Sequence, residues 1–370
     1  MRPVMPEAEY ACYPPEEDGG ATRSRIGFEA WRSTAAPGRA PMNEGSLDLG
    51  LTRRQVLAAA LATGASVVAG CASKGPAAGW VFVDDRNKTV RLSQRPTRIA
   101  AYTTSAAALR DWGVTPIGVF GTDPPNDPWL ADFPWADSEI VGSVYGEIDD
   151  EKLLALRTEL IVSRWFPLPQ RAPLFGFKDL TQEERIGAEL PIVGLSGRAI
   201  ATSQIDRFSD LARSLGVQVG GARIARAHEA FDRAAERLSA VARRKSDLRI
   251  IAVSGAQSTV YVAKIPAAGD LAFYRQRGVP LVSAQTSEPY WDRLDWSRTD
   301  KYPADGILYD TRPYALPLSA AKRIPDFAAL PAVHANQIGA WHVDPPPSYQ
   351  AYASTINNLA STIASWRRVT

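Results

Sequence analysis

The stretch Gly221–Lys245, with the sequence GARIARAHEAFDRAAERLSAVARRK, divides the chain into two similar halves. No proline or glycine interrupts it after Gly221, and arginine and lysine gather at its C-terminal end, where the helix dipole favours cations. At ~1.5 Å per residue, a helix of this length would extend about 36 Å. The stretch predicts one stiff helix, because apolar residues recur with the spacing of one helical face, at Ile224, Ala227, Phe231, Ala234, Leu238 and Val241.

Short apolar runs alternate with helical patterns on both sides of this helix. Glu159–Ser163 is such a run before the helix, and Leu248–Ser254 is one after it. Alternation of this kind is typical of βαβ units. It predicts an α/β protein of two Rossmann-like α/β lobes joined by a single long α-helix, with a cleft between the lobes.

These patterns also divide the chain into segments. Residues 72–95 are expected to form a tether and a small hairpin, with strands at Trp80–Val83 and Thr89–Leu92. The N-terminal lobe is assigned to residues 96–220, the linking helix to 221–245 and the C-terminal lobe to 246–370.

Two local patterns give more detailed expectations. Thr181 and Glu184 have the spacing of a capping box, which predicts a helix over Thr181–Glu189. The segment Trp291–Tyr302 is expected to be helical in part.

Composition restricts the function. The formal net charge is only +2, so nothing indicates nucleic acid as a partner. The two cysteines, Cys12 and Cys71, have no neighbour at metal or redox spacing. The three histidines are interpreted as packing or surface residues, and we expect no metal site and no cofactor. Of these, His334 and His342 flank one predicted strand and are the only conceivable metal pair.

The N-terminal segment reads as an export signal. Residues 1–50 lack periodicity and are expected to be disordered. In residues 51–71, Arg53 and Arg54 precede a ~15-residue apolar run, as in a twin-arginine signal. The run ends in Val-Ala-Gly-Cys at Cys71, which resembles the lipobox of bacterial lipoproteins and makes Cys71 the predicted lipidation site. The leader is long for a signal peptide, and translation from Met42 would give a compact one.

A series of motifs in the first lobe resembles a known family. The chain reads P-x-R-I at Pro96–Ile99, W-G-V-x-P-I-G-V at Trp112–Val119 and E-K-L-L-A-L-R-x-E-L-I-V at Glu151–Val162. In this order the motifs resemble the periplasmic-binding proteins for ferric siderophores and vitamin B12. The chain departs from the family's usual Lys-Pro-Asp, which is Arg-Thr-Glu at 157–159, and departs most in the second lobe at Trp291–Pro303.

The resemblance implies a class III periplasmic-binding-protein fold and a binding function without catalysis. It implies that the protein captures a metal chelate, most readily a ferric siderophore, with haem or cobalamin as other ligands, and delivers it to an ABC permease and its ATPase. The protein would be extracytoplasmic, lipid-anchored to the outer face of the cell membrane, and monomeric. It also implies one permease-docking carboxylate on each lobe. Glu151 matches the first by its position in the motif, and Asp295 is the candidate for the second.

The ligand-binding residues are expected just past the carboxyl ends of the strands, because ligands of open α/β sheets settle there. The set combines aromatic faces with two guanidinium groups, which suit a large chelate that exposes iron-bound oxygens. Its members are Tyr102, Thr103, Arg164, Trp165, Phe166, Gln257, Tyr309, Arg312 and Trp341, with His342 beside the last.

Two other function classes stay open from the residues alone. An exported cofactor-binding enzyme is disfavoured, because Gly216–Gly221 does not read G-x-G-x-x-G and Gly194–Gly197 does not match G-x-S-x-G. A sensory or adhesive lipoprotein could reuse the same fold without transport.

Overall fold

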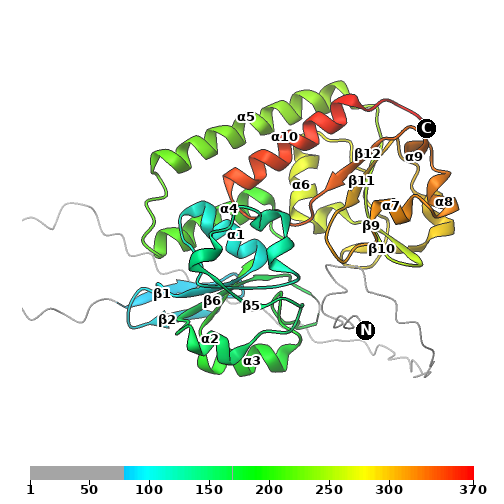
Figure 1. Ribbon diagram of the computed structural model, residues 1–370. Coiled ribbons are helices and arrows are strands. Elements are labelled where there is room, and N and C mark those ends of the chain that lie inside the picture. Colours follow the sequence, from blue (N-terminus) through cyan, green and yellow to red (C-terminus); the bar gives the residue numbers. More distant parts are fainter. Residues whose placement is uncertain (1–78, 169) are drawn as a thin grey trace, which may run out of the picture. The chain divides into compact units, whose positions relative to one another are not determined.

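The computed structural model describes residues 79–168 and 170–370. The predictions for Arg53, Arg54, Met42 and Cys71 lie outside the described residues. Within the described residues, two five-stranded sheets form the centres of two lobes, and one long helix leads from the first lobe to the second (Figure 1). The predicted α/β class is therefore confirmed.

The first lobe is built on a parallel sheet with the strand order β5-β4-β3-β6-β7. Its central strands β3 and β6 are buried on both faces, as their near-continuous apolar runs require. Gly113 ends the first helix with a φ of 98°, a conformation that glycine adopts without strain. The strands are β3 (Ile99–Tyr102), β4 (Gly118–Phe120), β5 (Glu139–Gly142), β6 (Leu160–Trp165) and β7 (Ile192–Ser196), and the helices are α1 (Thr103–Trp112), α2 (Asp150–Ala155), α3 (Leu180–Glu189) and α4 (Ala201–Ser214).

The second lobe has a mixed sheet with the order β10-β9-β8-β11-β12. Strands β8, β11 and β12 run parallel, whereas β9 and β10 pair antiparallel at one edge. The strands are β8 (Ile250–Gly255), β9 (Thr259–Ala263), β10 (Trp291–Asp295), β11 (Gly306–Asp310) and β12 (Ile338–Trp341), and the helices are α6 (Gly269–Gln276), α7 (Leu318–Ala321), α8 (Pro325–Ala328), α9 (Pro331–His334) and α10 (Tyr349–Ser365).

The linking helix α5 (Ala222–Arg244) lies alongside the closing helix α10 (Figure 1). Its buried face contains Phe231 and Leu238, which belong to the predicted apolar stripe. Arg237 reaches across to the side chains of Asn357 and Ser361 on α10. Because α10 of the second lobe packs along α5, the connecting helix is supported by a second helix along its length.

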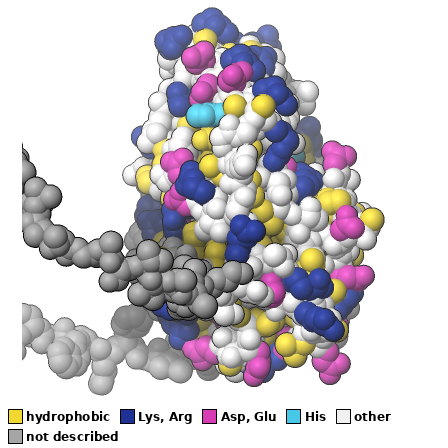
Figure 2. Space-filling model, turned by 90° about the vertical axis from the view of Figure 1, so that its left-hand side faces the viewer, with side chains coloured by type: hydrophobic (Ala, Val, Ile, Leu, Met, Phe, Trp, Pro, Cys, Tyr) yellow, Lys and Arg dark blue, Asp and Glu magenta, His cyan; other side chains and the backbone are white. Residues whose placement is uncertain are grey.

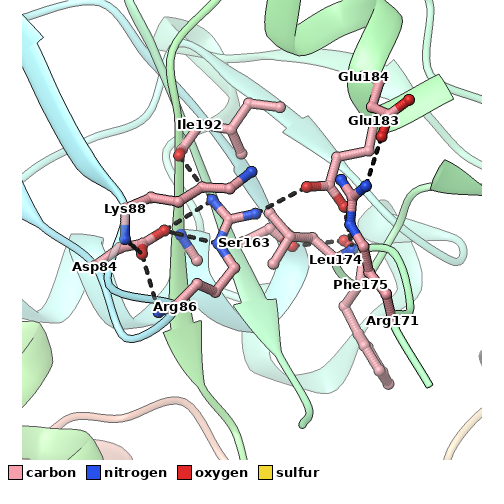
Figure 3. A network of polar contacts seen from close by, with 11 residues as sticks. Asp84, Arg86, Lys88, Ser163, Arg171, Leu174, Phe175, Glu183, Glu184 and Ile192 are labelled. Carbon is pink, nitrogen blue, oxygen red and sulfur yellow. Dashed lines mark hydrogen bonds and ion pairs between the residues drawn. The ribbon is translucent and has the colours of Figure 1, made fainter. Parts of the chain in front are cut away.

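The hairpin of β1 (Trp80–Val83) and β2 (Thr89–Leu92) is fastened to the first lobe by buried charges (Figure 3). Arg86 in its turn bridges the carboxylates of Asp84, at 2.7 Å, and of Glu183 on α3, at 2.8 Å. The second oxygen of Glu183 accepts from the backbone N–H of Leu174 at 2.9 Å. The network therefore connects the hairpin and α3 to the segment after β6.

The structure corrects one of the two local expectations and agrees with the other, that Trp291–Tyr302 is helical only in part. Helix α3 begins at Leu180, and its cap is Asp179, whose carboxylate accepts from the backbone N–H of Gln182 at 2.8 Å. The proposed capping box at Thr181 is wrong, because Asp179 and not Thr181 is the N-cap, and the Glu184 side chain pairs with Arg171. Trp291–Asp295 is strand β10, not helix, since its backbone pairs with β9, and a 3₁₀ turn at Trp296–Lys301 supplies the helical part.

Within the part of the chain that the structure describes, no helix is both long and apolar enough to cross a membrane. On the face presented in Figure 2, lysine and arginine side chains are interspersed with aspartate and glutamate side chains. That mixture agrees with the small net charge of +2.

Candidate functional site

Two adjacent pockets open where the lobes meet, and each is lined by residues of both lobes. We call them the Asp127 pocket, which includes Thr103, Asp127, Trp129 and His342, and the Trp341 pocket, which includes Phe166, Asp270, Trp291 and Trp341. They enclose about 530 Å³ and about 460 Å³ of space, open mouths included, and share Arg312 and Val343.

The pockets lie at the carboxyl ends of the parallel strands, as expected for an α/β sheet. Tyr102 ends β3 and Thr103 begins α1. Arg312 follows β11, His342 follows β12, and Phe166 follows β6. Five of the nine predicted ligand residues line one of the two pockets: Tyr102, Thr103, Phe166, Arg312 and Trp341. A sixth, Arg164, lines neither pocket but pairs with the lining residue Asp344.

The Asp127 pocket contains a partly buried carboxyl group. Asp127 caps a 3₁₀ turn by accepting from the backbone N–H of Trp129 at 2.9 Å. Burial raises the pKa of Asp127 to about 6. The Trp129 ring contacts the edge of His342 across the lobes, with centroids 5.6 Å apart. Burial lowers the pKa of His342, so this imidazole is neutral at pH 7.

The Trp341 pocket is aromatic, with two buried acids, Asp270 and Asp344, at its wall. The indole N–H of Trp341 donates to Asp270 at 2.7 Å, and the ring lies 5.9 Å from that of Trp291. Burial raises the pKa of Asp270 to about 6. On the first lobe, Phe166 packs on Phe175 with centroids 4.4 Å apart. The surface that this pocket offers to a ligand is therefore mostly apolar.

Both predicted arginines are occupied by carboxylates. Arg164 is fully buried and donates to Asp344 of the second lobe at 2.7 Å, and it also donates to Gln204. Arg312 forms a close ion pair with Asp310 two residues before it, at 2.5 Å. Both guanidinium groups are therefore paired with carboxylates, and a direct contact of either one with the ligand stays a prediction.

Besides Arg164, three other predicted residues lie outside both pockets. Tyr309 is core, since its hydroxyl donates to the carbonyl of Leu316 at 2.7 Å and its ring packs against Phe327. Gln257 is exposed on the turn between β8 and β9, because these strands form an antiparallel hairpin. Trp165 is half-buried at the end of β6 and lines neither pocket.

Sequence reasoning missed several lining residues. Asp127 and Trp129 lie in residues 121–139, which read only as a long loop. The local signal was Asp-Pro-Trp, because an aspartate before proline is a frequent helix cap. Asp270 and Asp344 carried no comparable signal, since their burial depends on the other lobe and on distant strands.

The two candidate docking acids are both exposed. Glu151 lies in the first turn of α2, which Asp149 caps by accepting from Lys152 at 2.9 Å. Asp295 ends β10 on the second lobe. Among the described residues, no group of three or more histidine, cysteine, aspartate or glutamate side chains is placed to hold a metal ion.

No model of a known protein family matches the chain, and no curated protein sequence matches it. Solved structures do match. DesE, a ferric-siderophore receptor protein from Streptomyces coelicolor, is 30% identical, with a TM-score of 0.73 and coverage of 79% of this chain and 100% of DesE.

Two further structures show the same fold at lower identity. The siderophore periplasmic binding protein from the fuscachelin gene cluster of Thermobifida fusca is 20% identical, with a TM-score of 0.51 and coverage of 72% of this chain and 96% of its own. FeuA, the triscatecholate siderophore binding protein from Bacillus subtilis, is 14% identical, with a TM-score of 0.57 and coverage of 75% of this chain and 94% of FeuA.

These neighbours are receptor and binding proteins rather than enzymes. The match to DesE spans the whole of that protein and both lobes of this one. The chain therefore belongs to the class III family of siderophore-binding, ABC-type substrate-binding proteins.

Proposed function

We propose that the protein captures a ferric siderophore in the cleft formed by the Asp127 pocket and the Trp341 pocket. The observation that carries this proposal is the cleft itself, which draws aromatic side chains from both lobes to the carboxyl ends of the strands. Membership of the family supports a metal chelate as the ligand. The iron is cargo already enclosed by its chelator, so the pocket needs to recognise only the outer surface of the chelate.

Tryptophan fluorescence tests this capture directly, because Trp129, Trp291 and Trp341 line the cleft. A ferric siderophore is expected to quench the emission saturably at one ligand per chain. The iron-free chelator, haem and cobalamin serve as comparisons. Saturable quenching by haem or cobalamin, with none by any ferric siderophore, would contradict the proposal.

We further propose that the protein works outside the cytoplasm as a lipoprotein and passes its ligand to an ABC permease. The twin arginines Arg53 and Arg54 and the lipobox at Cys71 support this placement. Two acyl chains on Cys71 would hold the protein stably at the membrane surface. Mass spectrometry of the mature N-terminus tests the anchor, and an unmodified Cys71 in membrane-derived protein would contradict it.

A further inference from the structure

The cleft is lined by more acidic than basic groups. The charged residues that line the two pockets are the acids Asp127, Asp270 and Asp344 and the single guanidinium of Arg312. That guanidinium is already paired with Asp310, and the buried guanidinium behind Asp344 belongs to Arg164. The exposed Arg198, whose guanidinium lies 5.7 Å from the ring centroid of Tyr290, adds one cation at the rim. The walls therefore carry no surplus of positive charge.

This charge distribution discriminates between the chemical classes of ferric chelate. Three catecholates supply six negative charges, so a ferric tris-catecholate keeps three of them. Three hydroxamates supply three, so a ferric tris-hydroxamate is neutral, and an ammonium group on its backbone makes it a cation. A trianion placed beside the carboxylates of Asp127 and Asp270, which have no ion pair within the described part of the chain, would be repelled in a partly desolvated site, whereas a neutral or cationic chelate would not.

Resting on the proposed function, we propose that the cleft selects ferric tris-hydroxamates over ferric tris-catecholates. We further assign to Asp127 the role of receiving a cationic group of the chelate. Among the described residues Asp127 has no ion-pair partner, although it lines the pocket. A carboxylate accepts up to about four hydrogen bonds, so its bonds to Trp129 and Thr103 leave lone pairs for a ligand ammonium.

The rest of the Asp127 pocket fits a neutral chelate. Thr103, Thr104 and Thr311 line it with hydroxyl groups, which donate to oxygens without adding charge. The hydroxyl of Thr104 is buried and has no hydrogen-bond partner among the described residues. A buried hydroxyl without a partner is unfavourable, and a hydroxamate oxygen of the ligand would satisfy it.

Three probes separate charge from shape. They are ferric desferrioxamine B, which carries an ammonium group, its N-acetylated form, which is neutral, and ferri-bacillibactin, a trianionic tris-catecholate. Fluorescence titration of the processed wild-type chain is expected to show tightest binding for the first and at least about hundredfold weaker binding for the last. Equal or tighter binding of ferri-bacillibactin would overturn the inference. If no chelate binds at all, the proposed function itself fails, which is a different result.

The variant Asp127→Asn tests the assigned residue. Asparagine also caps a helical turn, so the local fold is retained. Affinity for the ammonium-bearing chelate is expected to fall about tenfold, with little change for the acetylated one. Asp127→Glu keeps the charge and should retain the preference. Asp132→Asn, an exposed acid on the same loop, is the matched control and should change nothing. Equal shifts for both hydroxamates in Asp127→Asn would overturn the role of this carboxylate.

Discussion

Arg164 in the first lobe and Asp344 in the second form a buried ion pair, with Nη2 and Oδ1 2.7 Å apart. The residues are 180 positions apart in the chain. The Nε and Nη1 atoms of Arg164 and the Oδ2 atom of Asp344 have no hydrogen-bond partner among the described residues. The pair therefore holds the lobes together with most of its hydrogen-bonding capacity unused.

Removing one member of this pair should be strongly destabilising. Asp344→Ala leaves the Arg164 guanidinium buried without its counter-ion, for which we expect a loss of about 3–5 kcal/mol in the free energy of unfolding. Denaturant unfolding of the ligand-free protein measures it. The exposed pair of Arg171 and Glu184 is the control, and Glu184→Ala should cost less than about 1 kcal/mol. Equal losses in the two variants would contradict this interpretation.

The buried acid Asp270 should make stability depend on pH. Burial raises its pKa from 3.8 to about 6, so the folded state holds this proton more tightly than the unfolded state. The stabilising contribution is complete below about pH 4 and is lost as the pH rises through about 6. The difference amounts to about 3 kcal/mol at most.

Asp270→Asn keeps an acceptor for the indole of Trp341 and removes the titration. Its free energy of unfolding should vary less between pH 4 and pH 6 than that of the wild type. Parallel unfolding curves for both proteins across this interval would show that Asp270 does not titrate there.

The network in Figure 3 should matter for binding as well as for stability. Glu183→Ala removes one of the two carboxylate partners of Arg86 and the acceptor of the backbone N–H of Leu174, the residue before Phe175. We expect a loss of about 2–4 kcal/mol in stability and weaker siderophore binding, because Phe175 supports Phe166 at the pocket. Glu184→Ala, one residue along the same helix, should leave the affinity unchanged.

Quenching should depend on Trp129 rather than on Trp165. Trp129 lines the Asp127 pocket, whereas Trp165 lines neither pocket. Trp129→Phe should therefore reduce the amplitude of ligand quenching, and Trp165→Phe should change it little. A larger loss of quenching amplitude in the Trp165 variant than in the Trp129 variant would indicate that Trp165 contacts the ligand.

Cellular uptake of iron-55 supplied as the ferric siderophore tests the docking proposal, in variants whose ligand affinity is unchanged. Glu151→Ala and Asp295→Ala should each reduce transport about tenfold or more, because each would remove one charged contact with the permease. Glu147→Ala, an exposed acid just before α2, is the matched control. Wild-type uptake in both docking variants would dismiss this role.

Much of the fold follows from local pattern. The apolar stripe of Gly221–Lys245 indicated the linking helix, and the observed helix α5 covers Ala222–Arg244. The strands Trp80–Val83 and Thr89–Leu92 were placed correctly, because alternation and a polar turn are local signals. The strand Trp291–Asp295 was not predicted, because only its pairing with β9 decides that this short segment is extended.

The sequence alone determined which strands end in polar or aromatic residues, and so which residues could reach the cleft. Only the tertiary structure decided their electrostatic state. The sequence indicates that Arg164 is a cation facing the ligand, but in the structure the loop after β12 places Asp344 against it. The sequence likewise indicates Tyr309 as a site residue, but in the structure Phe327 of α8 covers its ring. Charge pairing and burial depend on contacts between distant segments, and no local pattern in a single sequence encodes them.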